Sequence, residues 1–286
     1  MIEIKEALLQ AISDLEAQSN SARLDAEILL AYVLMKTRSF LFSHPEAMLS
    51  SAQWHTFQHL LSERIKGVPI AYLTGMREFW SLPLQVCEDT LIPRPETELL
   101  VELTLKLLKD KKQAQILDLG TGSGAIALAC ASEKPNWQIT ACDCSGAALR
   151  TAEENASNLS LTNICFYKSD WFENISTNLQ FDAIVANPPY IAANDPHLLI
   201  GDLRFEPRLA LVSGDDGLIA IKHIIQHSLA RLKPGGILLL EHGFEQKSVI
   251  KSMLNNYGYS HVQCWQDWQG NDRVSGGKQD KGLVDT

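Results

Sequence analysis

The 286-residue sequence has no long hydrophobic run and no excess of basic residues. Its longest uninterrupted apolar stretch, residues 28–35, is far shorter than the roughly 20 residues that a membrane-spanning helix needs. The first residues also lack the basic flank and apolar stretch of a secretory signal. Acidic residues outnumber basic ones by 34 to 25, which argues against stable nucleic-acid binding through a basic surface. We therefore expect a cytoplasmic protein without a membrane or nucleic-acid partner.

The sequence also lacks a Cys-x-x-Cys pair among its six cysteines. Most of these cysteines stand among apolar residues, which predicts reduced, buried thiols rather than disulfides. Cys142 and Cys144 are two residues apart at the end of a predicted strand, so alternation predicts that both pack on one face.

What is present is an ordinary globular composition, with 45% hydrophobic and 21% charged residues, in a chain long enough for about two domains. Residues 1–72 show only helical periodicity, with helices predicted near 4–15, 24–35 and 51–66. The segment 73–93 has two short β-like runs around Ser81-Leu82-Pro83 and predicts a hairpin linker.

From residue 94 to 278 the pattern changes to alternating strands and helices, followed by a polar tail at 279–286. A helix opening at Pro95 comes first, because proline is tolerated in the first helical turn. Seven strands are predicted, at 116–119, 138–142, 165–167, 181–186, 236–240, 260–265 and 272–276. The intervening helices are predicted at 124–132, 146–158, 217–232 and 245–256. This alternation indicates an α/β domain, with a parallel sheet covered by helices on both faces and a ligand at the carboxyl ends of the strands.

A glycine-rich loop follows the first strand of this domain. It reads Gly120-Thr121-Gly122-Ser123-Gly124 and opens into an alanine-rich helix. Glycines let the backbone approach a ligand closely and leave amide groups available near a helix start. Asp143 ends the second strand, where a carboxylate is suited to accept both hydroxyls of a ribose. The pattern predicts an adenosine-containing ligand, although it also fits a dinucleotide.

The fourth strand ends in Asn187-Pro188-Pro189-Tyr190. Two prolines restrict the backbone, so the Asn187 side chain and the Pro188 carbonyl are held in fixed directions. Both offer carbonyl oxygens, and two converging acceptors suit one planar NH₂ group. Tyr190 is predicted to stack on a flat substrate.

With these motifs the sequence resembles the class I S-adenosylmethionine-dependent methyltransferases that modify planar nitrogens. Further segments resemble one family among them, the release factor glutamine methyltransferases (HemK/PrmC family), over about residues 2–278. These segments include Ile92-Pro93-Arg94-Pro95-Glu96-Thr97-Glu98, Ser169-Asp170-Trp171-Phe172 and Glu206-Pro207-Arg208-Leu209-Ala210-Leu211.

The resemblance implies N5-methylation of the glutamine in the Gly-Gly-Gln motif of class I peptide-chain release factors, which are proteins of translation termination. It implies a Rossmann-like catalytic domain at 94–278 with a mostly parallel seven-stranded sheet, preceded by a helical substrate-recognition domain. The S-adenosylmethionine contacts map onto Gly120, Thr121, Gly122, Ser123, Gly124, Asp143, Trp171 and Asn187. The substrate motif maps onto Asn187, Pro188, Pro189 and Tyr190, with catalytic roles for Asn187, Pro188 and Tyr190.

Three alternatives stay open on the residues alone. An adenine N6-methyltransferase would use the same Asn-Pro-Pro-Tyr segment on a nucleic acid, but it needs to grip phosphates, and this chain is acidic. An NAD-dependent oxidoreductase leaves that segment without a role, and a noncatalytic adaptor leaves the cofactor motifs without one. No metal is expected, because the histidine pairs His55/His59 and His223/His227 lack a nearby third ligand.

Overall fold

The computed structural model describes residues 2–280, which form two compact units. One unit contains residues 2–76 together with Leu199–Phe205, and the other contains Arg77–Leu198 together with residues 206–280. No helix in residues 2–280 is long and apolar enough to cross a membrane. The predicted roles of recognition domain, linker and catalytic domain stay predictions, because compactness does not assign a role.

The smaller unit is built from helices around one apolar core. Its helices are α1 (Ile4–Leu15), α2 (Ala22–Leu34), α3 (Arg38–Ser43), α4 (Ser51–Ile65) and α5 (Ile70–Thr74). The Ser50 side chain accepts a hydrogen bond from the Gln53 amide and so caps α4. The helices predicted near 4–15 and 51–66 are confirmed. The short α3 and α5 escaped prediction because their runs are too brief to show a helical period.

The second predicted helix is present as α2, and its buried face includes a carboxylate. Met35 is 90% exposed, whereas Asp25 is buried among alanines and leucines. Burial of this carboxylate is possible because Arg64 on α4 donates to it at 2.8 Å between Nε and Oδ2. Arg64 is 39 residues from Asp25 in the sequence, so this ion pair is not visible in the local pattern of the helix.

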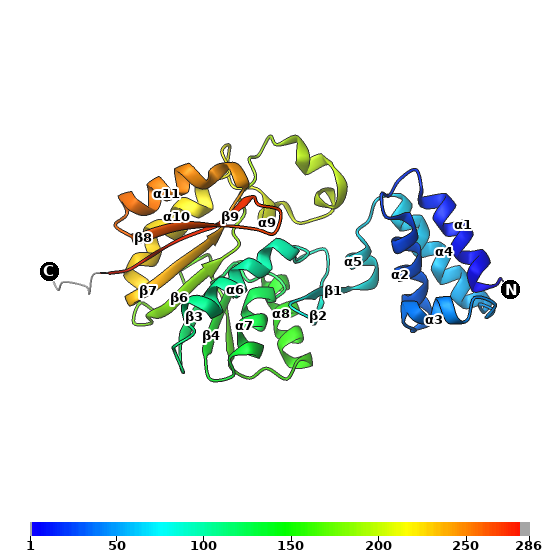
Figure 1. Ribbon diagram of the computed structural model, residues 1–286, viewed down its shortest axis with the longest axis horizontal. Helices are drawn as coiled ribbons and strands as arrows, with labels where there is room; N and C mark the ends of the chain where they lie inside the picture. Colours follow the sequence, from blue (N-terminus) through cyan, green and yellow to red (C-terminus); the bar gives the residue numbers. More distant parts are fainter. Residues whose placement is uncertain (1, 281–286) are drawn as a thin grey trace. The chain divides into compact units, whose positions relative to one another are not determined.

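The larger unit holds a two-stranded and a seven-stranded sheet (Figure 1). The hairpin strands are β1 (Met76–Phe79) and β2 (Leu82–Gln85), which confirms the predicted hairpin. The strands of the large sheet are β3 (Gln115–Leu119), β4 (Gln138–Asp143), β5 (Ile164–Lys168), β6 (Phe181–Ala186), β7 (Leu232–Glu241), β8 (Ser260–Gln266) and β9 (Asp272–Lys278). Their order is β5-β4-β3-β6-β7-β9-β8, and β9 runs antiparallel to both of its neighbours. The predicted mostly parallel sheet of seven strands is confirmed.

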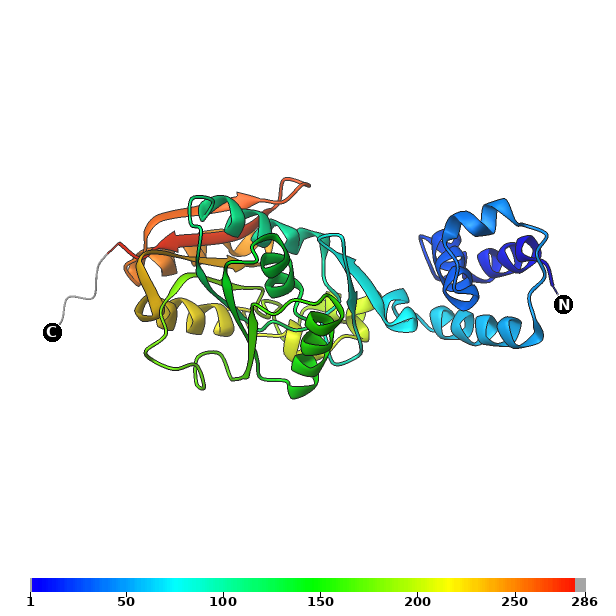
Figure 2. The same cartoon turned by 90° about the horizontal axis from the view of Figure 1, so that it is seen from below.

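Helices cover both faces of this sheet (Figure 1, and from below in Figure 2). One apolar cluster joins α6 (Glu98–Leu107), α7 (Ala125–Glu133) and α8 (Gly146–Asn158) to the sheet. A second cluster joins α10 (Ile219–Ser228) and α11 (Lys247–Asn256) to the opposite face. The change of face comes between β3 and β6, which are neighbours in the sheet. An open sheet of this kind binds ligands at such a switch point, outside the carboxyl ends of the strands.

Several shorter elements lie between these helices and strands, and one of them, η3 (Gly201–Arg204), falls in the segment that belongs to the smaller unit. The 3₁₀ turn η1 (Pro95–Thr97) leads into α6, so the helix predicted to open at Pro95 begins with a tighter turn. The turns η2 (Pro196–Leu199), η3 (Gly201–Arg204) and the helix α9 (Arg208–Leu211) lie between β6 and α10. The helix predicted at 217–232 is shorter than expected, because η4 (Leu229–Arg231) follows Ser228 and β7 already begins at Leu232. The last turn, η5 (Phe244–Gln246), precedes α11.

The cysteines match the prediction only in part. All six are free, but only Cys130 and Cys142 are buried, while Cys144 and Cys165 are exposed. Cys144 lies one residue beyond the end of β4, where strand alternation no longer applies, so it does not share the buried face of Cys142. The prediction that most of the thiols are buried is therefore wrong.

Candidate active site

A cavity of about 640 Å³ lies in the larger unit, at the carboxyl ends of four neighbouring parallel strands. This volume is in the range that small-molecule sites usually have. The predicted site residues that line it are Gly120 after β3, Asp143 at the end of β4, Trp171 after β5 and Asn187 after β6, joined by Gly122, Pro188 and Pro189. The fold therefore brings residues from four separate motifs to one cavity.

The glycine loop forms one side of this cavity. Its three glycines all have positive φ, from +57° to +89°, which side-chain-bearing residues rarely adopt. This conformation lets Gly122 donate its N–H to Asp143 Oδ2 at 2.9 Å. Thr121, Ser123 and Gly124 do not line the cavity. The Thr121 hydroxyl instead donates to Asp118 at 2.7 Å, and the Ser123 carbonyl accepts from Asn155 at 2.9 Å.

Asp118 is a buried carboxyl group that the sequence reasoning missed. It is 1% exposed, and burial raises the pKa of its carboxyl to about 7, against smaller lowering effects of hydrogen bonds from Thr121 and the Ala127 amide. Both of those bonds end on Oδ2, while Oδ1 is buried without a hydrogen-bond partner. The signal in the sequence was an acidic residue inside the otherwise apolar run Ile116–Leu119.

Asp143 is held rigidly at the cavity wall. Its Oδ1 accepts from the Ser145 amide at 2.8 Å while its Oδ2 accepts from Gly122. A carboxylate has about four acceptor positions, so two backbone bonds leave capacity for ligand hydroxyls. This geometry is compatible with the predicted ribose contact.

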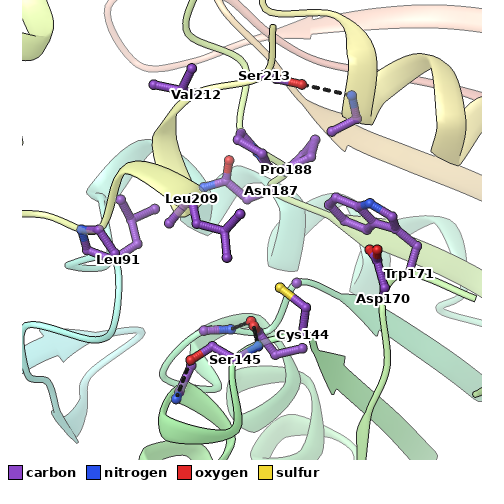
Figure 3. Close-up of a pocket in the computed structure, with 18 of the residues that line it drawn as sticks. Leu91, Cys144, Ser145, Asp170, Trp171, Asn187, Pro188, Leu209, Val212 and Ser213 are labelled. Atoms are coloured by element: carbon purple, nitrogen blue, oxygen red, sulfur yellow. Dashed lines mark hydrogen bonds between the residues drawn. The ribbon is translucent and has the colours of Figure 1, made fainter. Parts of the chain in front are cut away.

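The aromatic and apolar walls face each other across the elbow Asn187–Pro188 (Figure 3). Trp171 lies on one side of this elbow, with φ of +46°, next to Asp170. Leu91 and Leu209 lie on the other side. Sequence reasoning assigned no role to Asp170, Leu91 or Leu209, although all three lie within or beside segments that carried the family resemblance.

An ion pair between the half-buried Arg94 and the buried Glu206 ties the segment that carries Leu91 to the segment that carries Leu209. Arg94 donates to the buried carboxylate of Glu206, and Glu206 also accepts from the Ile92 amide at 3.3 Å. A charge pair that also satisfies a backbone amide holds two loops more firmly than either contact alone. Arg94 and Glu206 therefore fix the apolar wall opposite Trp171.

The side-chain amide of Asn187 has a defined partner. Its Nδ2 donates to the Thr97 hydroxyl at 3.1 Å, which leaves Oδ1 as the end of the amide that is able to accept from a ligand. Asn187 is half-buried and lines the cavity, as the prediction requires.

Tyr190 is not brought to the cavity wall with the other residues of its motif. Its hydroxyl donates to Glu241 at 3.3 Å, and its carbonyl accepts from Gln246 at 3.1 Å. Burial is the main cause of the raised pKa of its phenol. These contacts stabilise the elbow from behind, and they do not favour the predicted stacking of Tyr190 on a substrate.

Comparisons with known proteins place the chain in a family. Residues 6–75 match the model of the PrmC N-terminal domain, and residues 96–203 match that of the methyltransferase small domain. The release factor glutamine methyltransferase of Shewanella oneidensis is 48% identical over 275 residues, which cover 96% of each chain. The Escherichia coli protein of that name is 48% identical over 277 residues, covering 97% of this chain and 99% of that one.

Solved structures share the fold at low sequence identity. A methyltransferase from Pyrococcus furiosus gives a TM-score of 0.52 at 17% identity, covering 81% of this chain and all of that one. The 16S rRNA N2 G1207 methyltransferase of T. thermophilus, solved with AdoMet and guanosine, gives 0.53 at 19% identity over 71% of this chain and 49% of that one. These structures show only the fold, whereas the two relatives above match almost the whole chain at 48% identity. The chain belongs to the release factor glutamine methyltransferase family.

Proposed function

We propose that the protein transfers a methyl group from S-adenosylmethionine to the side-chain nitrogen of the glutamine in the Gly-Gly-Gln motif of class I peptide-chain release factors. The observation that carries the proposal is the shared cavity, in which the Asn187–Pro188 elbow lies beside the glycine loop and Asp143. The relatives named for this activity match nearly the whole chain. Because release factors act in translation, the same proposal places the protein in the cytoplasm.

The residues around the cavity fit the cofactor. The positive-φ glycines give a loop without side chains, and a Cβ built on Gly120 would lie 3.6 Å from the Trp171 ring. Gly120 and Gly122 would border the bound cofactor, Asp143 would accept its ribose hydroxyls, and the Trp171 indole would pack against its adenine. When bound, S-adenosylmethionine supplies an electrophilic methyl group on a sulfonium.

The elbow supplies the polar groups that a primary amide needs. An amide nitrogen is a poor nucleophile because its lone pair is delocalised into the carbonyl. Asn187 Oδ1 and the Pro188 carbonyl oxygen would accept its two N–H bonds and so fix the direction of the nitrogen. As positive charge develops on the nitrogen, the same two oxygens stabilise it more strongly than they stabilise the neutral amide. The methylated nitrogen then releases one proton to solvent, so no side-chain base is required.

A transfer assay tests this function directly. Purified protein would be incubated with methyl-labelled cofactor and a purified class I release factor. We expect label on the factor at its Gly-Gly-Gln glutamine and none on a factor in which that glutamine is replaced by alanine. Duplex DNA serves as the control for the adenine N6 alternative, and label on DNA with none on the factor would overturn the proposal.

The N-terminal domain predicted at residues 1–72 is proposed to recognise the protein substrate. Bases and acids are nearly balanced there, which suits contact with a protein surface better than contact with phosphates. A chain lacking these residues is expected to keep its affinity for the cofactor but to lose kcat/KM on the intact factor. Calorimetry with the cofactor and transfer rates on the factor separate the two effects.

A further inference from the structure

The wall of the cavity opposite Trp171 is apolar and partly exposed. Leu91 and Leu209 lie on this side of the Asn187–Pro188 elbow (Figure 3). Leu209 lines the cavity and is nevertheless 68% exposed. Its segment contributes three further apolar residues to the cavity, namely Pro207, Ala210 and Val212. Contiguous apolar surface beside a binding site indicates that a partner covers it when bound.

Backbone hydrogen bonds join this wall to the elbow. Ile191 follows the elbow segment Asn187–Tyr190 directly, and its amide donates to the Leu211 carbonyl at 2.9 Å. The Ile191 carbonyl accepts from the Ser213 amide at 3.0 Å. Because these two bonds pair the chain after the elbow with the segment 207–214, the wall keeps a defined position relative to the oxygens of the elbow.

A buried carboxylate holds the other end of the wall. Glu206 immediately precedes the segment of Leu209, and it accepts from the Arg94 guanidinium and, at 3.3 Å, from the Ile92 amide. Ile92 is the chain neighbour of Leu91. The separation of Leu91 and Leu209 is therefore set by a charged side chain and its two donors. Removing one partner of such a pair leaves a buried charge uncompensated, so the pair resists displacement.

The rest of the cavity indicates what this wall contacts. Trp171, which is proposed to pack against the adenine of the cofactor, lies across the elbow from Leu91 and Leu209 (Figure 3). The elbow between them carries the two oxygens proposed to accept the N–H bonds of the glutamine. With the cofactor on the side of Trp171, the side of the two leucines is left for the chain that delivers the glutamine. The lining residues of 207–212 carry no charge, so they suit backbone and small uncharged side chains.

We propose that Leu91 and Leu209 contact the peptide segment that carries the methylated glutamine. Glu206 and Arg94 are then positioning residues, which act on the substrate only through these two leucines. The inference rests on the proposed function and deepens it, because it assigns a contact for the protein substrate inside the cavity. The expected occupant has small, uncharged residues beside the glutamine, and the two glycines of the Gly-Gly-Gln motif meet this condition.

Substitutions of Leu209 test the contact. Leu209→Ala is expected to raise KM for a purified class I release factor on the order of 10-fold, because apolar groups that the complex would bury are removed. Its affinity for the cofactor and its urea midpoint are expected to stay unchanged, since the side chain is mostly exposed. Leu209→Met keeps most of the apolar area and is expected to stay within about twofold of wild type. Leu179→Ala is the matched control, because Leu179 is 36% exposed and precedes β6, at the edge of the sheet opposite the cavity.

Substitution of Glu206 tests the positioning role. Glu206→Gln keeps an acceptor for the Ile92 amide but removes the charge that holds Arg94, so KM for the factor is expected to rise about 5- to 10-fold with unchanged cofactor affinity. A merely structural role would instead lower the folded fraction, and with it kcat, at constant KM. Arg94→Lys keeps the positive charge and is expected to show a smaller rise in KM.

The double variant Glu206→Gln/Leu209→Ala separates a shared effect from two independent ones. Because Glu206 is proposed to act through Leu209, the combined rise in KM is expected to be clearly smaller than the product of the two single rises. A rise equal to that product would overturn the positioning role.

A binding measurement without turnover distinguishes this inference from the proposed function. The release factor is titrated by calorimetry into protein loaded with S-adenosylhomocysteine, and Leu209→Ala is expected to bind it on the order of 10-fold more weakly than wild type and Leu179→Ala. If this loss is seen but wild type transfers no methyl group, only the proposed function fails. If wild type methylates the factor but Leu209→Ala matches it in KM and in affinity, or loses cofactor affinity instead, the inference is overturned and the function stands. Absence of both transfer and binding in wild type would refute both.

Discussion

Asn187 uses the two ends of its amide differently, with Nδ2 on Thr97 and Oδ1 left for the substrate. In Asn187→Ala one of the two proposed acceptors for the reacting nitrogen is lost, so kcat is expected to fall about 10²- to 10³-fold. The unfolding free energy should change little, because the side chain is only half-buried. Single-turnover methyl transfer measures the effect, with exposed Asn178→Ala as control. Near-wild-type transfer by Asn187→Ala would remove this residue from the mechanism.

Asp143 belongs to the proposed cofactor-binding part of the site. Its carboxylate accepts hydrogen bonds from Gly122 in the glycine loop and from Ser145 at the start of α8. Asp143→Ala is expected to weaken cofactor binding about 10- to 100-fold, because hydrogen bonds to a charged acceptor contribute roughly 1.5–3 kcal/mol. Asp143→Asn keeps one acceptor oxygen and should lie between the two. Calorimetric titration with S-adenosylmethionine gives the affinities, and Asp110→Ala, at an exposed position, is the control. Equal affinity in Asp143→Ala and wild type would refute the ribose contact.

At the scale of elements, the turn from β3 into α7 depends on Gly124. A Cβ there would lie 2.8 Å from Leu128 Cδ1 and 3.2 Å from the Ala152 Cβ, at φ of +89°. Leu128 is fully buried and has no space to move, so Gly124→Ala is expected to cost about 2–4 kcal/mol of unfolding free energy. Gly270→Ala has a similar φ but nothing within 4 Å and should cost only about 1 kcal/mol. Urea unfolding compares the two, and equal losses would show that strain alone matters.

Elements with a strong local period were predictable from the sequence, and long-range contacts were not. The apolar run of β6 and the alternation from β3 to β9 indicated the sheet, because buried parallel strands are recognisable as short apolar stretches. The Asn187–Pro188 elbow was found because it directly follows such a strand, and Asp143 because it ends one. Thr97 was missed, since its hydrogen bond with Asn187 joins residues that are 90 apart in the sequence. The burial of Asp25 on α2 was not predictable, because its partner Arg64 is 39 residues away in the sequence.

At the scale of the whole molecule, buried carboxyl groups make the unfolding free energy depend on pH in two opposite ways, because the pKa of Asp182 is lowered and those of Asp118 and Glu241 are raised. Burial acts to raise the pKa of Asp182, but hydrogen bonds from Lys111, Lys233 and the Gln115 amide outweigh it and hold that pKa below its ordinary value. Stability from Asp182 is therefore present above about pH 4 and is lost as the pH falls through its lowered pKa. Asp118 and Glu241 act in the other direction, because burial raises both of their pKa values to about 7. The unfolding free energy is thus expected to be greatest near pH 4 and to decrease as the pH rises from about 4 to about 7.

Asp118 provides the sharper test of the alkaline limit. Its folded pKa lies above the unfolded value, so its contribution to stability is complete below about pH 4 and is lost as the pH rises through about 7. Asp118→Asn keeps an oxygen that is able to accept from both Thr121 and Ala127, because both bonds end on Oδ2. It avoids ionisation, so at pH 8.5 it is expected to raise the unfolding free energy by a few kcal/mol relative to wild type, and at pH 4.5 by much less. Urea midpoints at the two pH values measure this difference, with exposed Asp110→Asn expected to show none. If Asp118→Asn destabilises the protein equally at both pH values, then Asp118 is not held near neutrality by burial, and the alkaline loss must come from Glu241 alone.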